Sequence, residues 1–174
     1  MAKELQNTTK HEWTVKSVKT WKSPDGGGFS CNLYMDNKKV AECYNDGMGG
    51  MTIIGPWKSR EIAAAWDAHV DAQPPVTWSK AEKERAPFLR DIPADSDTVL
   101  DRMVDDYNLA RDLKRWSKKG TQTPFRFASD DDGAWRIFKG PFYLALPSIQ
   151  ERFRGRDEDA TVFTGTEVTV IHFD

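Results

Sequence analysis

The residues most suited to binding chemistry form the run Asn45-Asp46-Gly47-Met48-Gly49-Gly50, which lies between two strand-like segments. A backbone so rich in glycine either enters positive φ or lets another group approach closely. Successive amide N–H groups in such a loop can form a concave nest that holds an anion. A phosphate-binding P-loop is excluded, because neither its Gly-Lys-Ser/Thr ending nor a helix follows at residues 51–53. Two interpretations stay open, an anion-binding nest and a tight β-bulge turn.

A pair of arginines forms the second candidate. If the hairpin formed by residues 123–139 is centred on Asp131, Arg126 faces Arg136 across two strands. Like charges in that position repel. The repulsion is tolerable if both side chains are solvated, if the acids at 130–132 fold back on them, or if an anion bridges them. Guanidinium groups suit phosphate and carboxylate oxygens. The segment is therefore either an ordinary exposed hairpin or a nucleotide-binding corner.

Aromatic and cationic residues near these two segments complete the candidate site. Lys139 follows the second hairpin strand and would add a positive charge, and aromatic rings nearby could stack on a base. The expected ligand-binding residues are Asn45, Asp46, Gly47, Gly49, Gly50, Trp57, Arg126, Arg136, Lys139, Phe142 and Tyr143.

Other reactive residue types give no chemical motif. Acidic runs, including Asp101 and Asp105, fall where a helix end or a turn favours acids, and no histidine or lysine partner is in reach. The three histidines lack metal-ligand spacing. Cys31 and Cys43 fall in hairpin strands, in facing positions, and free thiols suit a cytosolic location. We expect no catalytic residues, no metal and no cofactor.

Composition narrows the class of protein. The chain has 174 residues, 39% of them hydrophobic, and a formal net charge of −2. These values are typical of one globular domain and do not create a cationic field for nucleic acid or anionic membranes. A basic cluster at residues 152–156 is neutralised by the acids at 157–159. The sequence has no run long enough to span a membrane and no apolar N-terminal signal.

Hydrophobic patterning predicts the elements that would hold these residues. Alternation predicts a β-meander in the first third of the chain, and Ser59 would cap a helix that runs to residue 72. A longer helix over residues 98–119 would be capped by Ser96 or Asp97 and closed by Gly120. The expected strands cover residues 13–21, 29–35, 39–44, 52–54, 123–128, 134–139 and 166–173, with a short helix over 147–155.

The sum of these elements is an α+β fold. It has about six or seven mostly antiparallel strands and two main helices, in a single domain over residues 1–174. Residues 73–95 carry four prolines and mixed charge, which indicates an irregular crossover or a flexible segment. An open edge of the meander also allows pairing across a two-fold axis, so a homo-oligomer fits the sequence.

Residues 38–50 resemble a stretch in small, uncharacterised bacteriophage proteins, in which a short β-meander carries a turn of the form N-D-G-x-G-G. The helix at 98–119, followed by Thr123-Pro124-Phe125-Arg126 and Lys139-Gly140-Pro141-Phe142, is similar in outline to that group. The resemblance implies a phage origin and the cytoplasm of a bacterial host. It implies no activity.

Small phage proteins without catalytic motifs often act by binding, so the leading expectation is a non-enzymatic anti-defence protein that sequesters a nucleotide-derived signal. Its partner would then be a small nucleotide-like ligand. One alternative is a protein–protein inhibitor that docks on a host or defence protein through exposed aromatic side chains. Another is a nucleic-acid accessory protein, although the overall charge argues against nucleic acid. An enzyme acting on nucleotides is the last alternative, and the sequence supplies no residues for it.

Overall fold

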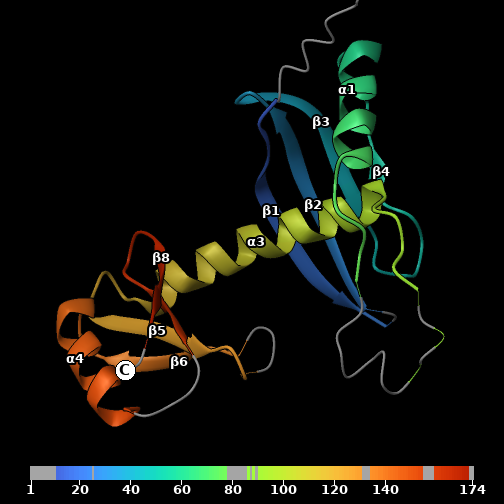
Figure 1. The fold of residues 1–174 in the computed structure, drawn as a ribbon. Coiled ribbons are helices and arrows are strands. Elements are labelled where there is room, and N and C mark those ends of the chain that lie inside the picture. Colours follow the sequence, from blue (N-terminus) through green and yellow to red (C-terminus); the bar gives the residue numbers. More distant parts are fainter. Residues whose placement is uncertain are drawn as a thin grey trace, which may run out of the picture. The chain divides into compact units, whose positions relative to one another are not determined.

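The computed structural model describes residues 11–24, 26–77, 86, 88, 90–130, 134–154 and 159–172. In these ranges the chain forms eight strands and three helices, so the α+β class is confirmed (Figure 1). The expected six or seven strands and two main helices are too few. The chain divides into two compact units, Met1–Tyr107 and Asn108–Asp174. No helix in the described ranges is long and apolar enough to cross a membrane.

The first unit contains an antiparallel sheet in the order β1-β2-β3-β4, as the meander predicted. Its strands are β1 (Trp13–Ser23), β2 (Gly26–Met35), β3 (Lys38–Asn45) and β4 (Ile53–Ile54). Alternate residues point to one face, which is buried, because side chains in a strand repeat every second residue. The other face stays open.

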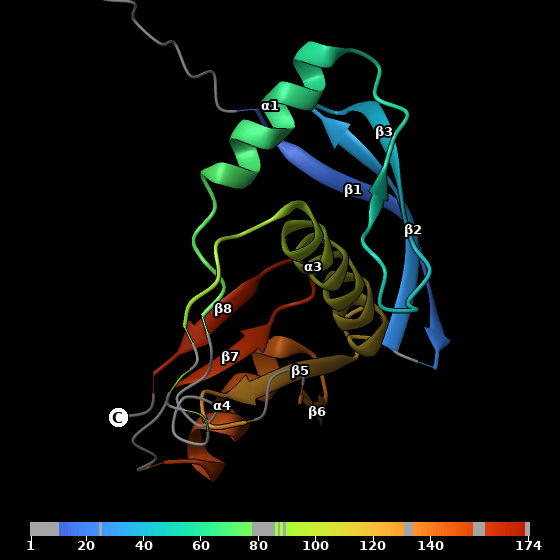
Figure 2. The same cartoon turned by 90° about the vertical axis from the view of Figure 1, so that its right-hand side faces the viewer.

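Two helices cover the buried face of this sheet (Figure 2). Helix α1 (Arg60–Asp71) begins after Ser59, whose hydroxyl accepts a hydrogen bond of 3.3 Å from the Ile62 N–H, as the capping pattern predicted. The first part of α3 (Ser96–Trp116) supplies the remaining cover. The core residues are Trp13, Val15, Val18, Phe29, Cys31, Leu33, Val40, Ala41, Cys43, Trp66, Val70, Val99, Leu100 and Val104.

The start of α3 differs from its prediction. The cap is Asp95 rather than Ser96 or Asp97: its carboxylate accepts from the Thr98 N–H at 2.8 Å, while the Thr98 hydroxyl accepts from the Asp95 N–H at 3.0 Å. This reciprocal pair satisfies two donors at the helix start. The carboxylate of Asp97 is used elsewhere, since it accepts from the Thr52 N–H at 2.8 Å.

The second unit contains an antiparallel sheet in the order β6-β5-β7-β8. Its strands are β5 (Gln122–Phe127), β6 (Arg136–Lys139), β7 (Ala160–Phe163) and β8 (Val168–Ile171). Strand β7 was not predicted. It is short and almost wholly buried between β5 and β8, so it lacks the alternation of polar and apolar residues that marks a half-exposed strand.

Helix α4 (Phe142–Arg152) covers one face of this sheet. The sequence predicted its start at Pro147, because proline favours the first helical turn. The helix instead begins five residues earlier, after Pro141, and holds Pro147 inside. The core of this unit comprises Phe125, Phe127, Ala145, Ile149, Ala160, Val162 and Ile171.

The crossover at 73–95 is described at its two ends and at residues 86 and 88. Val76 and Ile92 exchange backbone hydrogen bonds of 2.8 and 3.1 Å and so form an isolated antiparallel bridge. Residues 78–85, 87 and 89 of this predicted segment lie outside the described residues.

Candidate functional site

The open face of the first sheet is hollowed. A cavity of about 350 Å³ lies there, with Lys19, Asn32 and Glu42 among its polar lining. One row of cross-strand partners runs across this hollow. In the strand register Lys19 pairs with Ser30, Ser30 with Tyr44, and Tyr44 with Ile53. Residues paired in this way project from one face.

A β-bulge in β1 shapes this face. The register shifts between Lys16 and Lys19, so that Ser17 and Val18 together oppose Cys31 of β2. Ser17 lines the hollow and adopts a left-handed φ of 57°. A bulge bends its strand and increases the local twist, and non-glycine residues in this conformation are enriched at functional sites.

Five exposed apolar side chains belong to the loop between β3 and β4 and to strands of this sheet, and we name them the loop patch: Trp21, Tyr44, Met48, Met51 and Ile53. Tyr44 and Ile53 also line the hollow. The rings of Trp21 and Tyr44 lie 5.7 Å apart, and Tyr44 pairs with Ile53 across the sheet. The two methionines come from the loop between β3 and β4. Exposure reaches 66% at Ile53 and 82% at Met51. The exposed apolar group formed by Trp21, Tyr44 and Ile53, with two exposed methionines on the adjoining loop, is typical of an interaction site.

The predicted anion nest uses its amides internally. The Asn45 side-chain oxygen accepts from the Gly47 N–H at 2.8 Å, and the Asp46 carboxylate accepts from the Met48 N–H at 2.9 Å. The Asn45 amide also donates to the Thr52 hydroxyl at 3.0 Å. Such turns satisfy the backbone with short polar side chains. Two of the N–H groups that would bind an anion are therefore engaged, which favours the tight-turn interpretation.

The same loop is fixed against the tip of the β1–β2 hairpin. The Ser23 hydroxyl donates to the Gly47 carbonyl, and the Trp21 indole N–H donates to the Asp46 carbonyl at 3.3 Å. Gly47 has a φ of 75°, and a Cβ there would lie 2.6 Å from the Gly28 nitrogen. A glycine is thus required at position 47, because the backbone at Gly28 lies too close for a side chain. The loop is a rigid support for the loop patch.

Three other predicted residues of the first unit differ in exposure. Gly49 and Gly50 are exposed, and a Cβ at Gly49 would meet no atom within 4 Å. Trp57 is half-buried against the first core, with its ring 6.5 Å from that of Trp66. Its indole is largely used in packing rather than offered for stacking on a base.

The predicted facing of Arg126 and Arg136 is wrong. Arg136 pairs with Phe125, so the register differs by one residue and the two arginines point to opposite faces. The guanidinium of Arg126 lies 5.4 Å from the Trp135 ring, and that of Arg136 lies 5.4 Å from the Phe127 ring.

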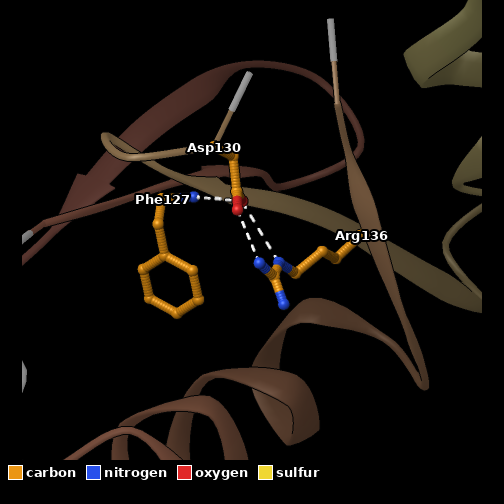
Figure 3. Close-up of polar contacts among 3 residues, drawn as sticks. All are labelled: Phe127, Asp130 and Arg136. Atoms are coloured by element: carbon orange, nitrogen blue, oxygen red, sulfur yellow. Dashed lines mark hydrogen bonds and ion pairs between the residues drawn. The ribbon is translucent and has the colours of Figure 1, made fainter. Parts of the chain in front are cut away.

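Asp130 explains this register (Figure 3). Its carboxylate accepts from the Phe127 N–H at 2.9 Å and from the Arg136 Nε at 3.1 Å and Nη2 at 2.5 Å. The Asp130 side chain is only 10% exposed. An acid folding back on the arginine was one of the three arrangements expected for this hairpin. It pairs the charge of Arg136 within the protein.

The remaining predicted residues lie at the end of β6 and the start of α4. Lys139 is exposed and pairs with Gln122 across the sheet. Phe142 is half-buried against the second core, whereas Tyr143 is 72% exposed. The predicted residues from Asn45 to Trp57 thus belong to the first unit, and those from Arg126 to Tyr143 belong to the second.

A second, smaller cavity of about 200 Å³ lies in the second unit between β6 and α4. Arg136 and Arg152 contribute to its lining, together with the rings of Phe125, Phe138 and Phe153. The Arg152 guanidinium lies 5.7 Å from the Phe153 ring. The sequence placed Arg152 only in a basic cluster, because the true helix boundaries that bring it to β6 were not predicted.

The residues of the loop patch were not predicted as a site either. The sequence could have indicated Tyr44 and Ile53, because each is a large apolar residue at a strand position where alternation predicts an exposed polar one. Trp21 and the two methionines carry none, because their positions depend on the contact between the loop and the hairpin tip.

Comparison of the chain with protein-family models, curated proteins and solved structures finds no match.

Proposed function

We propose that this chain is a non-enzymatic binding protein that docks on another protein through the loop patch and the adjoining hollow. The observation that carries the proposal is the exposure of five large apolar side chains on the hydrogen-bonded loop between β3 and β4 and on the strands next to it. Aromatic residues and methionine are enriched in protein interfaces, and the loop's internal hydrogen bonds reduce the entropy cost of ordering it.

Charge on the same face specifies the partner further. Lys19 lines the hollow, and none of the described carboxylates pairs with it. Glu42 is the acid of this lining, and it is already bound to Lys39 at 2.6 Å. That hydrogen bond and charge lower the pKa of Glu42. A partner that presents apolar side chains beside an acidic residue would complement this face.

The biological setting is part of the proposal. The resemblance of residues 38–50 to phage proteins supports a phage-encoded protein that acts in the cytoplasm of a bacterial host. The partner would then be a host or defence protein, and covering its surface would inhibit it.

The experiment is a pull-down from host lysate, followed by titration of the retained protein. We expect a stoichiometric partner whose affinity falls about tenfold or more in Ile53→Glu and Met51→Glu, because interface anchors each contribute more than about 1 kcal/mol. Lys19→Glu should also weaken binding, and the loss of affinity should be larger at low salt than at high salt.

Val168→Glu is the matched control, since Val168 is a similarly exposed apolar strand residue of the second unit. Equal loss of binding in Val168→Glu and Ile53→Glu would contradict the proposal. So would a partner that binds all three first-unit variants with unchanged affinity.

A second candidate function is capture of a nucleotide-derived signal, and the cavity between β6 and α4 favours it. The guanidinium of Arg152 beside phenylalanine rings suits an anion with an aromatic group, whereas Arg136 in the same lining is held by Asp130. A thermal-shift screen against mono-, di- and cyclic nucleotides tests this function. A bound nucleotide at a hundredfold excess over Kd stabilises the protein by about 2.7 kcal/mol.

The shift should disappear in Arg152→Ala and persist in Arg102→Ala, an exposed arginine of α3 in the first unit. Absence of a shift with every nucleotide would remove this second candidate and leave the docking proposal in place.

A further inference from the structure

The two cysteines of the chain are brought together under the hollow. Cys31 of β2 and Cys43 of β3 are directly paired in the antiparallel register, and both are free thiols. They are 3% and 2% exposed and belong to the first core, while both also contribute to the lining of the cavity on the open face. The sequence predicted facing positions, and the register confirms them.

The pairing geometry is compatible with a covalent bond between the sulfurs. Residues directly opposite in an antiparallel pair have Cα atoms about 4.5–5.5 Å apart, and disulfides span about 4.4–6.8 Å. The register between β2 and β3 is regular at this point, because its shift comes later, between Leu33 and Tyr34. Formation of a disulfide would therefore need little backbone movement.

The two thiols already interact with each other. The hydrogen bond with Cys43 lowers the pKa of the Cys31 thiol, although burial acts in the opposite direction. The same hydrogen bond, together with burial, raises the pKa of Cys43. One sulfur is thus favoured as the nucleophilic thiolate and the other as the proton donor beside it.

We propose that Cys31 and Cys43 form a reversible redox-modification site, in which a peroxide converts the two thiols into one cross-strand disulfide. The Cys31 thiolate attacks a peroxide oxygen, the O–O bond breaks, and a sulfenic acid and a hydroxide form. The Cys43 sulfur then attacks the Cys31 sulfur, the S–O bond breaks, and the S–S bond forms. The two thiol protons leave with the two oxygens as two molecules of water. An external thiol reverses the reaction by exchange.

Oxidation would act on the proposed docking face. Tyr44 directly follows Cys43 in β3, and Ser30 and Asn32 flank Cys31 in the wall of the hollow. A disulfide would lock β2 to β3 beneath the loop patch and restrict the unfolded chain. We therefore expect the oxidised protein to unfold at a higher temperature than the reduced one.

The test treats the folded, full-length protein with hydrogen peroxide and measures intact mass after alkylation in denaturant. The expected product is monomeric, lacks the mass of two hydrogen atoms, takes up no alkylating reagent and returns to the dithiol form with dithiothreitol. Cys43→Ser should instead stop at a sulfenic acid on Cys31, which dimedone traps. Because the chain has only two cysteines, no other intramolecular disulfide can give this result.

Three results would overturn the proposal. The first is folded protein in which both thiols stay open to alkylation after peroxide treatment, while protein unfolded in urea forms the disulfide. The second is a product that consists of disulfide-linked dimers. The third is an oxidised monomer that unfolds at a lower temperature than the reduced protein, since strain would then outweigh the cross-link. None of these readouts depends on a docking partner, so the site can fail while the proposed function stands.

Discussion

The glycine loop of the first unit and the arginine hairpin of the second were both candidates for anion binding, and in each of them polar groups that an anion would need are bonded within the protein. They do so by different means. In the loop, the neutral amide of Asn45 and the backbone approach at Gly47 hold the chain. In the hairpin, a nearly buried carboxylate, Asp130, holds Arg136 and the Phe127 N–H.

The loop is therefore held by close backbone packing, and the hairpin by an ion pair. At Gly47 the loop depends on the absence of a side chain, so it should not tolerate added volume there. The hairpin depends on charge, so it should respond to salt. A motif that looks suited to phosphate can therefore serve to fix the backbone, and in the function proposed above the binding surface is formed by the side chains next to it.

The largest effect should come from Gly47→Ala. A Cβ there would lie 2.5 Å from the Ser23 hydroxyl and 2.6 Å from the Gly28 nitrogen, in a left-handed backbone. We expect a loss of about 3 kcal/mol in the free energy of unfolding, from strain and overpacking together. Urea titration measures it. Gly49→Ala is the control, because its φ is similar but its Cβ meets nothing, and it should lose about 1 kcal/mol.

The next effect should come from Asp130→Ala. This change leaves the N–H of the buried Phe127 and the guanidinium of Arg136 without their carboxylate partner. We expect a loss of about 2 kcal/mol, because a hydrogen bond to a charged group contributes about 1.5–3 kcal/mol. Arg136→Ala should lose less, about 1 kcal/mol, since the Phe127 bond survives. Equal losses in the two variants, measured by urea unfolding, would show that the Phe127 bond contributes nothing.

Much of the fold could be predicted from local patterns. Ser59 gives a standard capping signal, and α1 begins where it indicates. Alternation in the first third of the chain marks one face of a meander, and the strands follow it. Cys31 and Cys43 were placed opposite each other for the same reason.

The errors arise where a distant contact decides a local choice. Pairing of Arg136 with Phe125 rather than Arg126 follows from Asp130, which could equally have stayed in solvent. Helix α4 passes through Pro147, and its packing on the second core offsets the lost hydrogen bond. The loop patch needs the contact of Gly47 with Gly28, which no periodicity encodes.

A smaller effect is expected from Asp95→Ala. It tests whether an ionisable side chain that bonds to nearby backbone makes the stability of the protein depend on pH. Asp95 at the start of α3 resembles Asn45 in bonding to nearby backbone, but it is ionisable. Hydrogen bonds from the Thr98 N–H and hydroxyl lower the pKa of Asp95 below its usual value. We expect Asp95→Ala to lose about 1 kcal/mol at neutral pH, the usual value of a helix cap.

The sign of the pH dependence follows from the lowered pKa. Because the folded state favours the carboxylate, its stabilisation is complete above the unfolded pKa of about 4 and is lost as pH falls through the folded pKa. Urea unfolding of the parent and of Asp95→Ala should therefore differ less in acid than at neutral pH. Asn45→Ala, which removes no ionisable group, should differ from the parent equally at both. A constant difference for Asp95→Ala would mean that the uncharged acid caps the helix just as well.

The smallest expected effect is a change of coupling energy with salt, and it compares the loop and the hairpin directly. A double-mutant cycle of Asp130→Ala with Arg136→Ala isolates their coupling, and a cycle of Asn45→Ala with Thr52→Ala isolates the hydrogen bond in the loop. Raising the salt concentration to about 1 M should lower the first coupling by about 0.5 kcal/mol, since the Arg136 side chain of this pair is half-exposed and salt can screen it. The second should not change, because it joins neutral groups. If both couplings fell together, salt would be acting on the whole fold, and the distinction between a steric loop and an electrostatic hairpin would be lost.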